Sequence, residues 1–526
     1  MNLPREPGFK LGVDFGTTRT VVACADRGNY PVVSFLDQHG DASDWFPSVV
    51  AEQAGELFFG FEALARGDAG SVVRSFKRLL SAPGAVPGKP VTVGNVTLGL
   101  GELIRRFLVA LREALVSRSN LGVGGPDVPL RSVVAVPANA HAAQRLVTLE
   151  AFRAAGFAPG AMLNEPSAAG FEYTHRHRAT LSARRDHVVV YDLGGGTFDA
   201  SLVRMHGPRH EVLSTAGVNL LGGDDFDAVL ASLALDAAGL SAADLSRSAI
   251  ARLASQCRDA KERLNPSSRK ITIDLEDALQ RAHPEVTLPV ASFYEACAPL
   301  VDRSIEAMLP VMSRLDASGG GGPDGLPDDV AGIYVVGGAS ELPIVARALR
   351  ERFGRRVHRS PYPSAAIAIG LAIACDDEAG FELADRYGRT FGVFREGAGG
   401  GEITFDPIFT SETAIPEREG PGRRRAPVRF RRDYRAAHNV GHFRFLECSS
   451  VGEDGHPRGD MTLSGDVLFP FDPRLDAVED LQSVEVERIG DGPRIEEEYS
   501  LDENGIVAVT IRNVDLGYER EYRLGA

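Results

Sequence analysis

Short apolar runs that contain one aspartate and end in a glycine turn occur twice in the first half of the chain. Residues 188–193 form such a run around Asp192, continue into Gly194-Gly195-Gly196-Thr197, and are followed by a second apolar run to position 203. Residues 11–15 repeat the plan around Asp14, with Gly16-Thr17-Thr18 as the turn and 20–24 as the return. Short runs of this kind, separated by glycine, predict buried β-hairpins.

The two turns suggest a chemistry. Glycine lets a ligand approach the backbone closely, turn amides can face anionic oxygens, and a carboxylate can hold magnesium or its waters. One such turn is equally typical of a tight β-turn with a solvated aspartate. Because Asp14 and Asp192 stand in equivalent places, we favour two similar lobes that face one metal-bound phosphate chain.

Helical periodicity and short strands alternate up to about residue 375, which predicts an α/β architecture. A third glycine turn, Gly337-Gly338, follows an apolar run. We expect residues 63–80 to be mostly helical and the segment Asn164-Glu165-Pro166 to lead into a helix. Further helices are expected at 98–116, 226–265, 292–315 and 364–375, and strands at 131–137 and 270–275.

Beyond Asp376 the helical periodicity fades and short alternating runs replace it. The clearest pair, 495–501 and 506–511, flanks Asn504-Gly505, and Asn-Gly between two such runs is the strongest short hairpin signal. We expect an antiparallel β domain of about 140 residues here. The predicted domains are 1–378 (α/β), 379–386 (linker) and 387–526 (β).

Composition narrows the function classes. With 526 residues the chain has room for two to four domains, and its net charge of −15 argues against broad nucleic-acid binding. The five cysteines show no pairing pattern, which indicates buried thiols in a reducing compartment. The start of the chain lacks an apolar signal core, and the longest apolar run is too short to cross a bilayer. We therefore expect a cytoplasmic protein without a membrane partner.

One basic run departs from this acidic balance. Residues 418–435 carry eight arginines and no lysine. The run could bind an acidic partner or nucleic acid, or it could be a solvated strand pair with its loop. We favour the solvated strands, because the acidic tract 476–487 could neutralise the charge within the chain.

Taken in order, the motifs resemble those of the seventy-kilodalton heat-shock chaperone family, also called DnaK-type. The resemblance covers about residues 11–383 and continues more weakly through 385–515. The Asn-Glu-Pro and Phe-Lys-Arg-Leu segments narrow the match, since the glycine turns also occur in actins and sugar kinases. The motifs are Val13-Asp14-Phe15-Gly16-Thr17-Thr18, Phe76-Lys77-Arg78-Leu79, Val136-Pro137-Ala138, Asn164-Glu165-Pro166, 192–199, 221–227 and Val336-Gly337-Gly338.

The resemblance implies a two-lobed, actin-like (ribonuclease H-like) ATPase domain followed by an antiparallel β-sandwich. It implies ATP or ADP with Mg²⁺ in the cleft, with K⁺ as a further candidate ion. It places Asp14 and Asp192 near the metal, mainly through water, and Asp199 beside the metal and Thr197. Lys77 would face the γ-phosphate and Glu165 would help to hold the attacking water. The phosphates would meet Gly16, Thr17, Thr18, Gly194, Gly195, Gly196 and Thr197, the adenosine would meet Lys261, Gly337 and Gly338, and Pro137 and Arg145 match a relay to the domain interface.

The residue types agree with this chemistry. Phosphoryl transfer to water needs positioning and charge neutralisation more than covalent help. Only five of the 57 basic residues are lysines, so finding Lys77 and Lys261 at two motif positions is an uncommon coincidence. Alternatively, Lys77 is a solvated lysine at a helix end and Glu165 a helix N-terminal charge favoured by the dipole.

The sequence also departs from the family pattern. Glu341 replaces an arginine that stacks on adenine, and Ser364 replaces an aspartate, so weaker or less selective nucleotide binding is expected. Ala161 replaces an arginine that meets the J-domain partner, which puts dependence on an ordinary J-protein in doubt. The apolar linker survives only as Phe381-Glu382-Leu383-Ala384-Asp385. No helical segment follows the β region before Ala526, so we expect a lidless β domain.

We therefore expect a chaperone-like ATPase that couples slow Mg-ATP hydrolysis to the binding of extended apolar peptides by its β domain. A J-domain protein and a nucleotide-exchange factor are candidate partners. The first alternative is a nucleotide-gated regulator or scaffold that binds one folded protein with little turnover. The second is a small-molecule kinase on the same fold, since fold does not fix function; the Asn164-Glu165-Pro166 motif argues against it.

Overall fold

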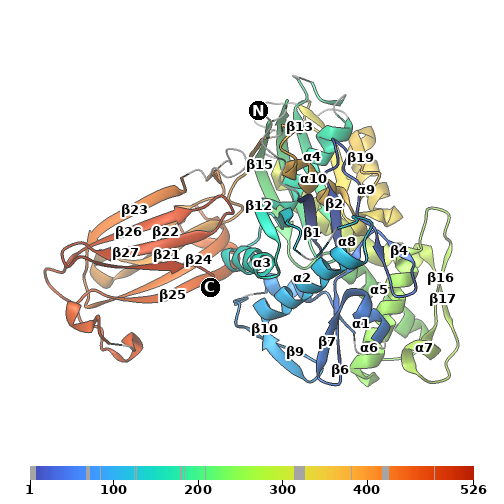
Figure 1. The fold of residues 1–526 in the computed structure, drawn as a ribbon, viewed down its shortest axis with the longest axis horizontal. Helices are drawn as coiled ribbons and strands as arrows, with labels where there is room; N and C mark the ends of the chain where they lie inside the picture. Colours follow the sequence, from blue (N-terminus) through green and yellow to red (C-terminus); the bar gives the residue numbers. More distant parts are fainter. Residues whose placement is uncertain are drawn as a thin grey trace. The chain divides into compact units, whose positions relative to one another are not determined.

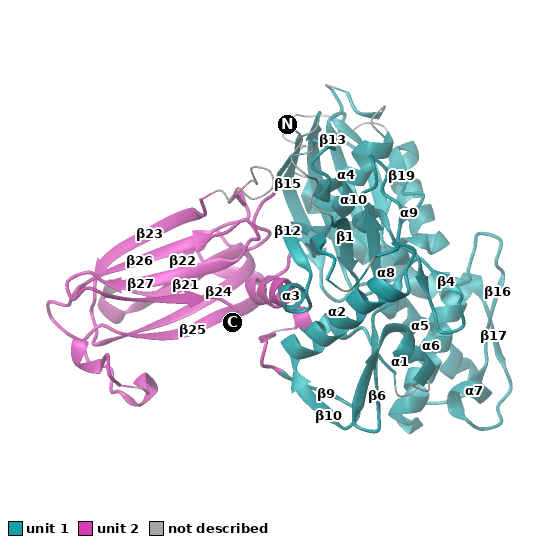
Figure 2. Ribbon diagram, in the orientation of Figure 1, with its two compact units in different colours: residues 1–79, 90–138, 151–383 teal, residues 80–89, 139–150, 384–526 magenta. Residues whose placement is uncertain are grey.

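The computed structural model describes the whole chain except residues 1–7, 67–71, 83, 124, 126, 178–179, 183, 208, 313–325, 381, 417–425, 479 and 526. The chain divides into two compact units (Figure 2). We call residues 1–79, 90–138 and 151–383 the α/β unit, and residues 80–89, 139–150 and 384–526 the β unit. The domain limits suggested by the sequence stay a prediction, and Phe381 of the predicted linker lies outside the described residues.

The first sheet of the α/β unit is built on the first predicted hairpin. Strand β1 (Phe9–Phe15) pairs antiparallel with β2 (Arg19–Cys24) and parallel with β11 (Leu130–Val136). The sheet order is β12-β11-β1-β2-β5, with β12 spanning Ala158–Asn164 and β5 Phe46–Pro47. A Cβ at Gly12 would lie 2.2 Å from the carbonyl oxygen of Ala368 in helix α10 (Ala366–Cys375). Glycine is therefore needed for the close packing of this helix on β1.

The second sheet is built on the second predicted hairpin. Strand β13 (His187–Leu193) pairs antiparallel with β14 (Phe198–His206), which places Asp192 opposite Asp199, and parallel with β18 (Val330–Val336). The order is β19-β18-β13-β14-β15-β20 (Figure 1). The remaining strands are β15 (Arg209–Val218), β19 (Val357–Arg359) and β20 (Glu382–Ala384).

Helices flank both sheets, and α4 (Glu165–His177) packs against α10. The helices predicted at 98–116, 292–315 and 364–375 are present with shifted ends, although residues 313–315 lie outside the described residues, and the helical region predicted at 226–265 is divided into α5 and α6. The other helices of the unit are α1 (Gly60–Arg66), α2 (Leu100–Ser117), α5 (Gly223–Ala238), α6 (Arg247–Glu262), α7 (Leu275–Leu279), α8 (Val290–Met312) and α9 (Pro343–Phe353). Most of helix α3 (Ala142–Ala154) belongs to the β unit. Smaller strands complete the unit: β3 (Phe35–Leu36), β4 (Ala42–Ser43), β6 (Val49–Gln53), β7 (Glu56–Phe59), β8 (Val72–Arg74), β9 (Pro90–Val93), β10 (Val96–Gly99), β16 (Lys270–Ile273) and β17 (Val286–Pro289).

The expectation that residues 63–80 are mostly helical is wrong in part. Helix α1 ends at Arg66, β8 pairs with β6, and Lys77 lies in a short 3-10 helix, η1 (Phe76–Ser81). The β-branched pair in β8 suits a strand. Ser75 then adopts a left-handed φ of 55°, which turns the chain into η1.

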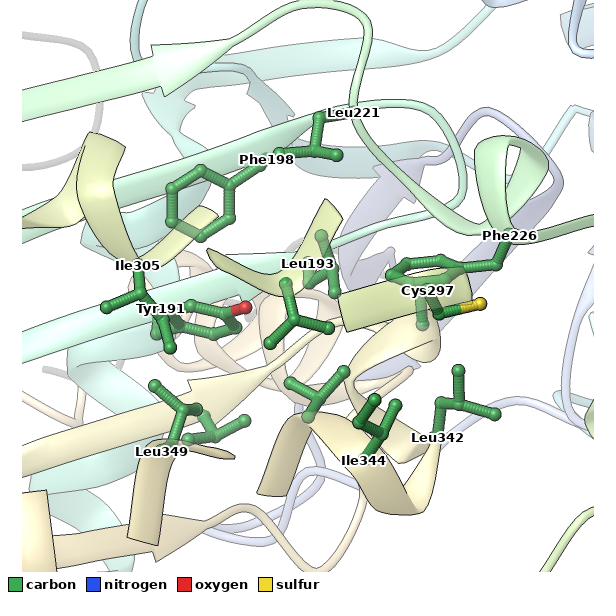
Figure 3. Close-up of a cluster of buried hydrophobic side chains, with 14 of the residues drawn as sticks. Tyr191, Leu193, Phe198, Leu221, Phe226, Cys297, Ile305, Leu342, Ile344 and Leu349 are labelled. Atoms are coloured by element: carbon green, nitrogen blue, oxygen red, sulfur yellow. The ribbon is translucent and has the colours of Figure 1, made fainter. Parts of the chain in front are cut away.

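A continuous apolar core fixes the second hairpin from one side (Figure 3). Tyr191, Leu193 and Phe198 are among the hairpin residues in this core. The side chains labelled with them are Leu221, Phe226, Cys297, Ile305, Leu342, Ile344 and Leu349. The Tyr191 hydroxyl lies 2.6 Å from the Ser304 hydroxyl, which satisfies its polar end. The hairpin is thus held by packing, while its glycine turn stays outside the core.

Two antiparallel sheets form the β unit, with strand orders β22-β21-β24-β25 and β23-β26-β27-β28. The strands are β21 (Thr390–Gly397), β22 (Glu402–Phe409), β23 (Val428–Arg435), β24 (Val440–Val451), β25 (Pro457–Pro470), β26 (Arg494–Leu501), β27 (Val507–Asn513) and β28 (Tyr518–Arg523). The hairpin predicted at Asn504-Gly505 is confirmed: Gly505 has a φ of 71° and its N–H donates to the Asp502 carbonyl at 3.0 Å.

The basic run of the β unit is paired where the structure describes it. Arg429 and Arg431 lie against Glu498 of the neighbouring strand, and Arg432 lies 2.7 Å from Asp406. Arg418 and 423–425 lie outside the described residues. The described part supports the interpretation as solvated strands. In the parts of the chain that the structure describes, no helix is long and apolar enough to cross a membrane.

Candidate functional site

A cavity of about 430 Å³ lies in the α/β unit where the two hairpin turns meet. All the predicted site residues line it except Gly196 and Asp199. They are Asp14, Gly16, Thr17, Thr18, Lys77, Glu165, Asp192, Gly194, Gly195, Thr197, Lys261, Gly337 and Gly338. Residues from six separated stretches of sequence therefore come together around one space.

The two glycine turns face each other across a very short gap. A Cβ at Gly195 would lie 2.7 Å from the Thr18 hydroxyl oxygen, and one at Gly196 would lie 2.9 Å from the methyl group of Thr17. A side chain at position 195 or 196 would therefore collide with the first turn. Both turns can present backbone amides and hydroxyls to the cavity, which suits a chain of anionic oxygens.

Lys77 and Glu165 form a buried ion pair in the cavity wall. The Lys77 Nζ donates to Glu165 Oε1 at 3.1 Å, and each side chain is only 8% exposed. Glu165 is the first residue of α4, where a negative charge is stabilised by the helix dipole. The solvated-lysine interpretation of Lys77 is therefore wrong, because its ammonium group is buried against a carboxylate.

Three buried aspartates lie beside this pair, and the attraction of Lys77 does not offset the cost of burying their charges. Burial raises the pKa of Asp14 to about 7, with repulsion from Glu165 adding to the shift and Lys77 opposing it. Burial and then repulsion from Glu165 raise the pKa of Asp192 and of Asp199 well above the usual range. Asp199 Oδ1 is buried without a hydrogen-bond partner among the described residues. Such a group of carboxylates would be stabilised by a cation.

These carboxylates do not form a closed metal centre by themselves. Among the described residues, no three His, Cys, Asp or Glu side chains converge closely enough to hold a metal ion. Mg²⁺ commonly keeps several waters and binds one or two carboxylates together with phosphate oxygens. The residues present therefore fit a hydrated Mg²⁺ that arrives with a phosphate ligand.

The third glycine turn extends the cavity away from the hairpins. Gly337 follows β18 with a φ of 86°, and a Cβ there would lie 2.4 Å from Asp192 Oδ1. Lys261, which also lines the cavity, donates to the Gly223 carbonyl at 2.7 Å and lies 2.6 Å from Asp227 Oδ1. Lys261 thus ties the start of α5 to the end of α6 beside the second turn.

Sequence reasoning assigned no role to two arginines that help to build this wall. The Arg78 guanidinium donates to the Gly196 carbonyl at 3.0 Å and to Asp225 at 3.1 Å. Arg258 lines the cavity and lies 2.8 Å from Asp224. Both carried a signal: Arg78 is adjacent to Lys77, and Arg258 precedes Lys261 by three residues, on the same face of a helix.

The structure also shows where the positions lie at which the sequence departs from the family pattern. Glu341 and Ser364 line the cavity beyond Gly338 and lie 3.3 Å apart, and Arg359 lies 3.4 Å from Glu341. Ala161 is buried in β12. Arg145 is buried in the β unit, where its guanidinium donates to the Asn504 carbonyl at 3.2 Å.

Comparison with known proteins decides the family. A family model described as Hsp70 protein matches residues 127–389, half of the chain. The chain belongs to the Hsp70 family. Its predicted fold class, an actin-like α/β domain followed by an antiparallel β-sandwich, is confirmed by this membership and by the strand orders above.

Curated Hsp70-family relatives share the same region. A chaperone protein HscA homolog from Colwellia psychrerythraea is 31% identical over 389 residues, which cover 71% of this chain and 59% of the relative. A protein of the same name from Laribacter hongkongensis is 34% identical over 393 residues, covering 72% of this chain and 60% of the relative. The match thus spans about three fifths of the length of these relatives.

Proposed function

We propose that this Hsp70-family protein binds Mg-ATP in the cavity of the α/β unit and hydrolyses it slowly. The observation that carries the proposal is the buried Lys77–Glu165 pair, set beside two facing glycine turns and three carboxylates of raised pKa. A cation would offset the charge of the carboxylates, and phosphate oxygens and a positioned water would meet Lys77 and Glu165.

In this proposal each residue type has a specific task. Lys77 neutralises charge on the terminal phosphate, and Glu165 orients the attacking water. Asp14 and Asp192 hold the waters of Mg²⁺, with Asp199 beside Thr197. Bound Mg²⁺ would neutralise the phosphate charge, and K⁺ is a further candidate ion. The phosphate contacts are assigned to Gly16, Thr17, Thr18, Gly194, Gly195 and Gly196, and the adenosine contacts to Lys261, Gly337 and Gly338.

We further propose that the β unit binds extended peptide. It contains a cavity of about 1370 Å³, lined by residues of β21, β24 and the β25–β26 connection. A peptide can pair with exposed backbone while pockets select alternate side chains. The relatives carry the name chaperone, which supports a chaperone over a scaffold that binds one folded protein. The proposed domains are 1–378 and 387–526 with a linker at 379–386, and the proposed helpers are a J-domain protein and a nucleotide-exchange factor.

A peptide array probed with and without Mg-ATP tests this assignment. Binding of many apolar peptides, weakened by ATP, is the expected result for a chaperone. Failure to bind any peptide, together with the capture of one folded protein, would favour the scaffold. Reciprocity gives a second check, because peptide must weaken ATP binding by the same factor as ATP weakens peptide binding.

A further inference from the structure

The last part of the β25–β26 connection lines the β-unit cavity through Val486 and Arg488. Residues 485–489, which we call the strap, pair antiparallel with residues 437–439 just before β24, with a bridge between His438 and Arg488. The Asn439 N–H donates to the Glu487 carbonyl at 3.0 Å, and the Ile489 N–H donates to the Ala437 carbonyl at 2.9 Å. The strap is therefore held by strand-like hydrogen bonds.

Asn439 contributes its side chain to the same attachment. Its Nδ2 donates to the Glu485 carbonyl at 3.0 Å, and its Oδ1 accepts from the Glu487 N–H at 2.9 Å. Asn439 itself is buried. In the strap, Val486 is 61% exposed, and Ile489 is partly buried against the apolar core of the β unit. A short exposed strand with few apolar contacts opens at low cost in free energy.

Arg488 extends from the strap to the opposite side of the cavity. Its guanidinium pairs with the Glu396 carboxylate at the end of β21 and donates to the Gly399 carbonyl at 2.9 Å. His438 Nε2 lies 3.6 Å from the same carboxylate. Arg488, Glu396, Gly399 and His438 all line the cavity. Arg488 thus joins the strap to the end of β21 and to the segment at Gly399, all at the rim of the cavity.

We propose that an extended peptide with an arginine at the place of Arg488 displaces the strap from the cavity. The Arg488–Glu396 ion pair holds the strap in place, and the arginine of the peptide replaces Arg488 in this pair. The inference rests on the proposed peptide binding of the β unit and specifies what that site takes. A guanidinium satisfies a carboxylate and a carbonyl at once, as Arg488 does here. A peptide strand with arginine offers the same donors and the same backbone pairing.

The strap sequence itself supplies the probe. A labelled peptide Ser-Val-Glu-Val-Glu-Arg-Ile-Gly copies residues 483–490, and a second peptide carries glutamate in place of the arginine. Fluorescence anisotropy would measure the association rate and affinity of both with the full-length wild type, Arg488→Glu, Glu396→Arg and the double exchange. Arg429→Glu on β23 is the control, because Arg429 does not line the cavity.

We expect Arg488→Glu to bind the arginine peptide about two- to fivefold faster and tighter than the wild type, the range of an exposed ion pair. Glu396→Arg should instead prefer the glutamate peptide, and the double exchange should return toward the wild type. Equal binding of both peptides by all four proteins, with an unrelated apolar peptide still bound, would reject the strap but keep the proposed function. Absence of binding by every peptide, the apolar one included, would reject both.

Discussion

Lys77 and Glu165, which are 88 positions apart, meet in a buried hydrogen-bonded pair of 3.1 Å in the wall of the α/β cavity. The helix dipole favours a carboxylate at Glu165, but it does not account for a lysine buried against it. A buried ion pair is weak evidence for stability, since desolvation offsets much of the attraction. Its position beside two phosphate-type turns is better explained by chemistry on a bound ligand.

The first prediction concerns the far end of the cavity. Glu341 and Arg359 form a half-exposed pair there. Glu341→Arg should tighten ATP by up to about tenfold, because a guanidinium over the base adds a cation–π attraction of about 0.5–2 kcal/mol. Calorimetric titration of ATP checks this, with Arg347→Glu on the exposed face of α9 as a charge control. An unchanged or weaker affinity would show that another residue covers the base.

The second prediction uses the raised pKa of Asp14. Its folded-state pKa of about 7 exceeds the usual 3.8, so the folded protein binds more protons than the unfolded chain between about pH 4 and 7. The free energy of unfolding therefore falls as the pH rises through this window. Without nucleotide, Asp14→Asn should raise the melting temperature by a few degrees at pH 7.5 and by less at pH 5, since about 1.4 kcal/mol accompanies each pKa unit.

Scanning calorimetry at the two pH values checks this, with the exposed Asp26→Asn as the control. Asp14→Asn should also lose the stabilisation that Mg-ATP gives the wild type. A variant that melts lower than the wild type at pH 7.5 would contradict the account of Asp14 as a carboxylate placed for a cation.

The third prediction concerns the core of the β unit. Arg395 lies 2.8 Å from Glu497, whose side chain is fully buried. Arg395→Ala leaves that carboxylate without its main partner, and a loss of about 3–5 kcal/mol is expected. Arg431→Ala, which removes a largely exposed arginine from β23, should cost less than about 1 kcal/mol. Thermal unfolding of the intact chain compares the two variants. Similar losses of unfolding free energy in both would mean that Glu497 finds another partner.

The parts of the site that could be predicted from the sequence are those whose signal lies within one short stretch of the chain. Asp14 and Asp192 stand in short hairpins whose signal is complete within fifteen residues, and both hairpins are present. Glu165 begins a helix, as the Asn-Glu-Pro segment suggests. The segment around Lys77 was harder, because a left-handed Ser75 and pairing of β8 with a distant strand overrode a local helical pattern.

Long-range contacts account for what sequence reasoning missed. Arg78 and Arg258 act through carbonyl and carboxylate groups on other elements, and no local pattern reveals such partners. The strap is a further case. Valine and glutamate alternate over residues 484–487, but this local pattern does not reveal the pairing with 437–439, which depends on one buried asparagine almost fifty positions away.

Single-turnover hydrolysis of Mg-ATP by Lys77→Ala and Glu165→Ala tests the central claim most directly. Each variant should hydrolyse about 10²-fold more slowly than the wild type, the order expected for loss of a positioned charge or water-orienting group, while ATP binding is reduced less. Lys270→Ala and Glu113→Ala, which change exposed residues, should keep the wild-type rate. Unchanged hydrolysis in both cavity variants, with folding intact, would contradict the assignment of this pair to catalysis.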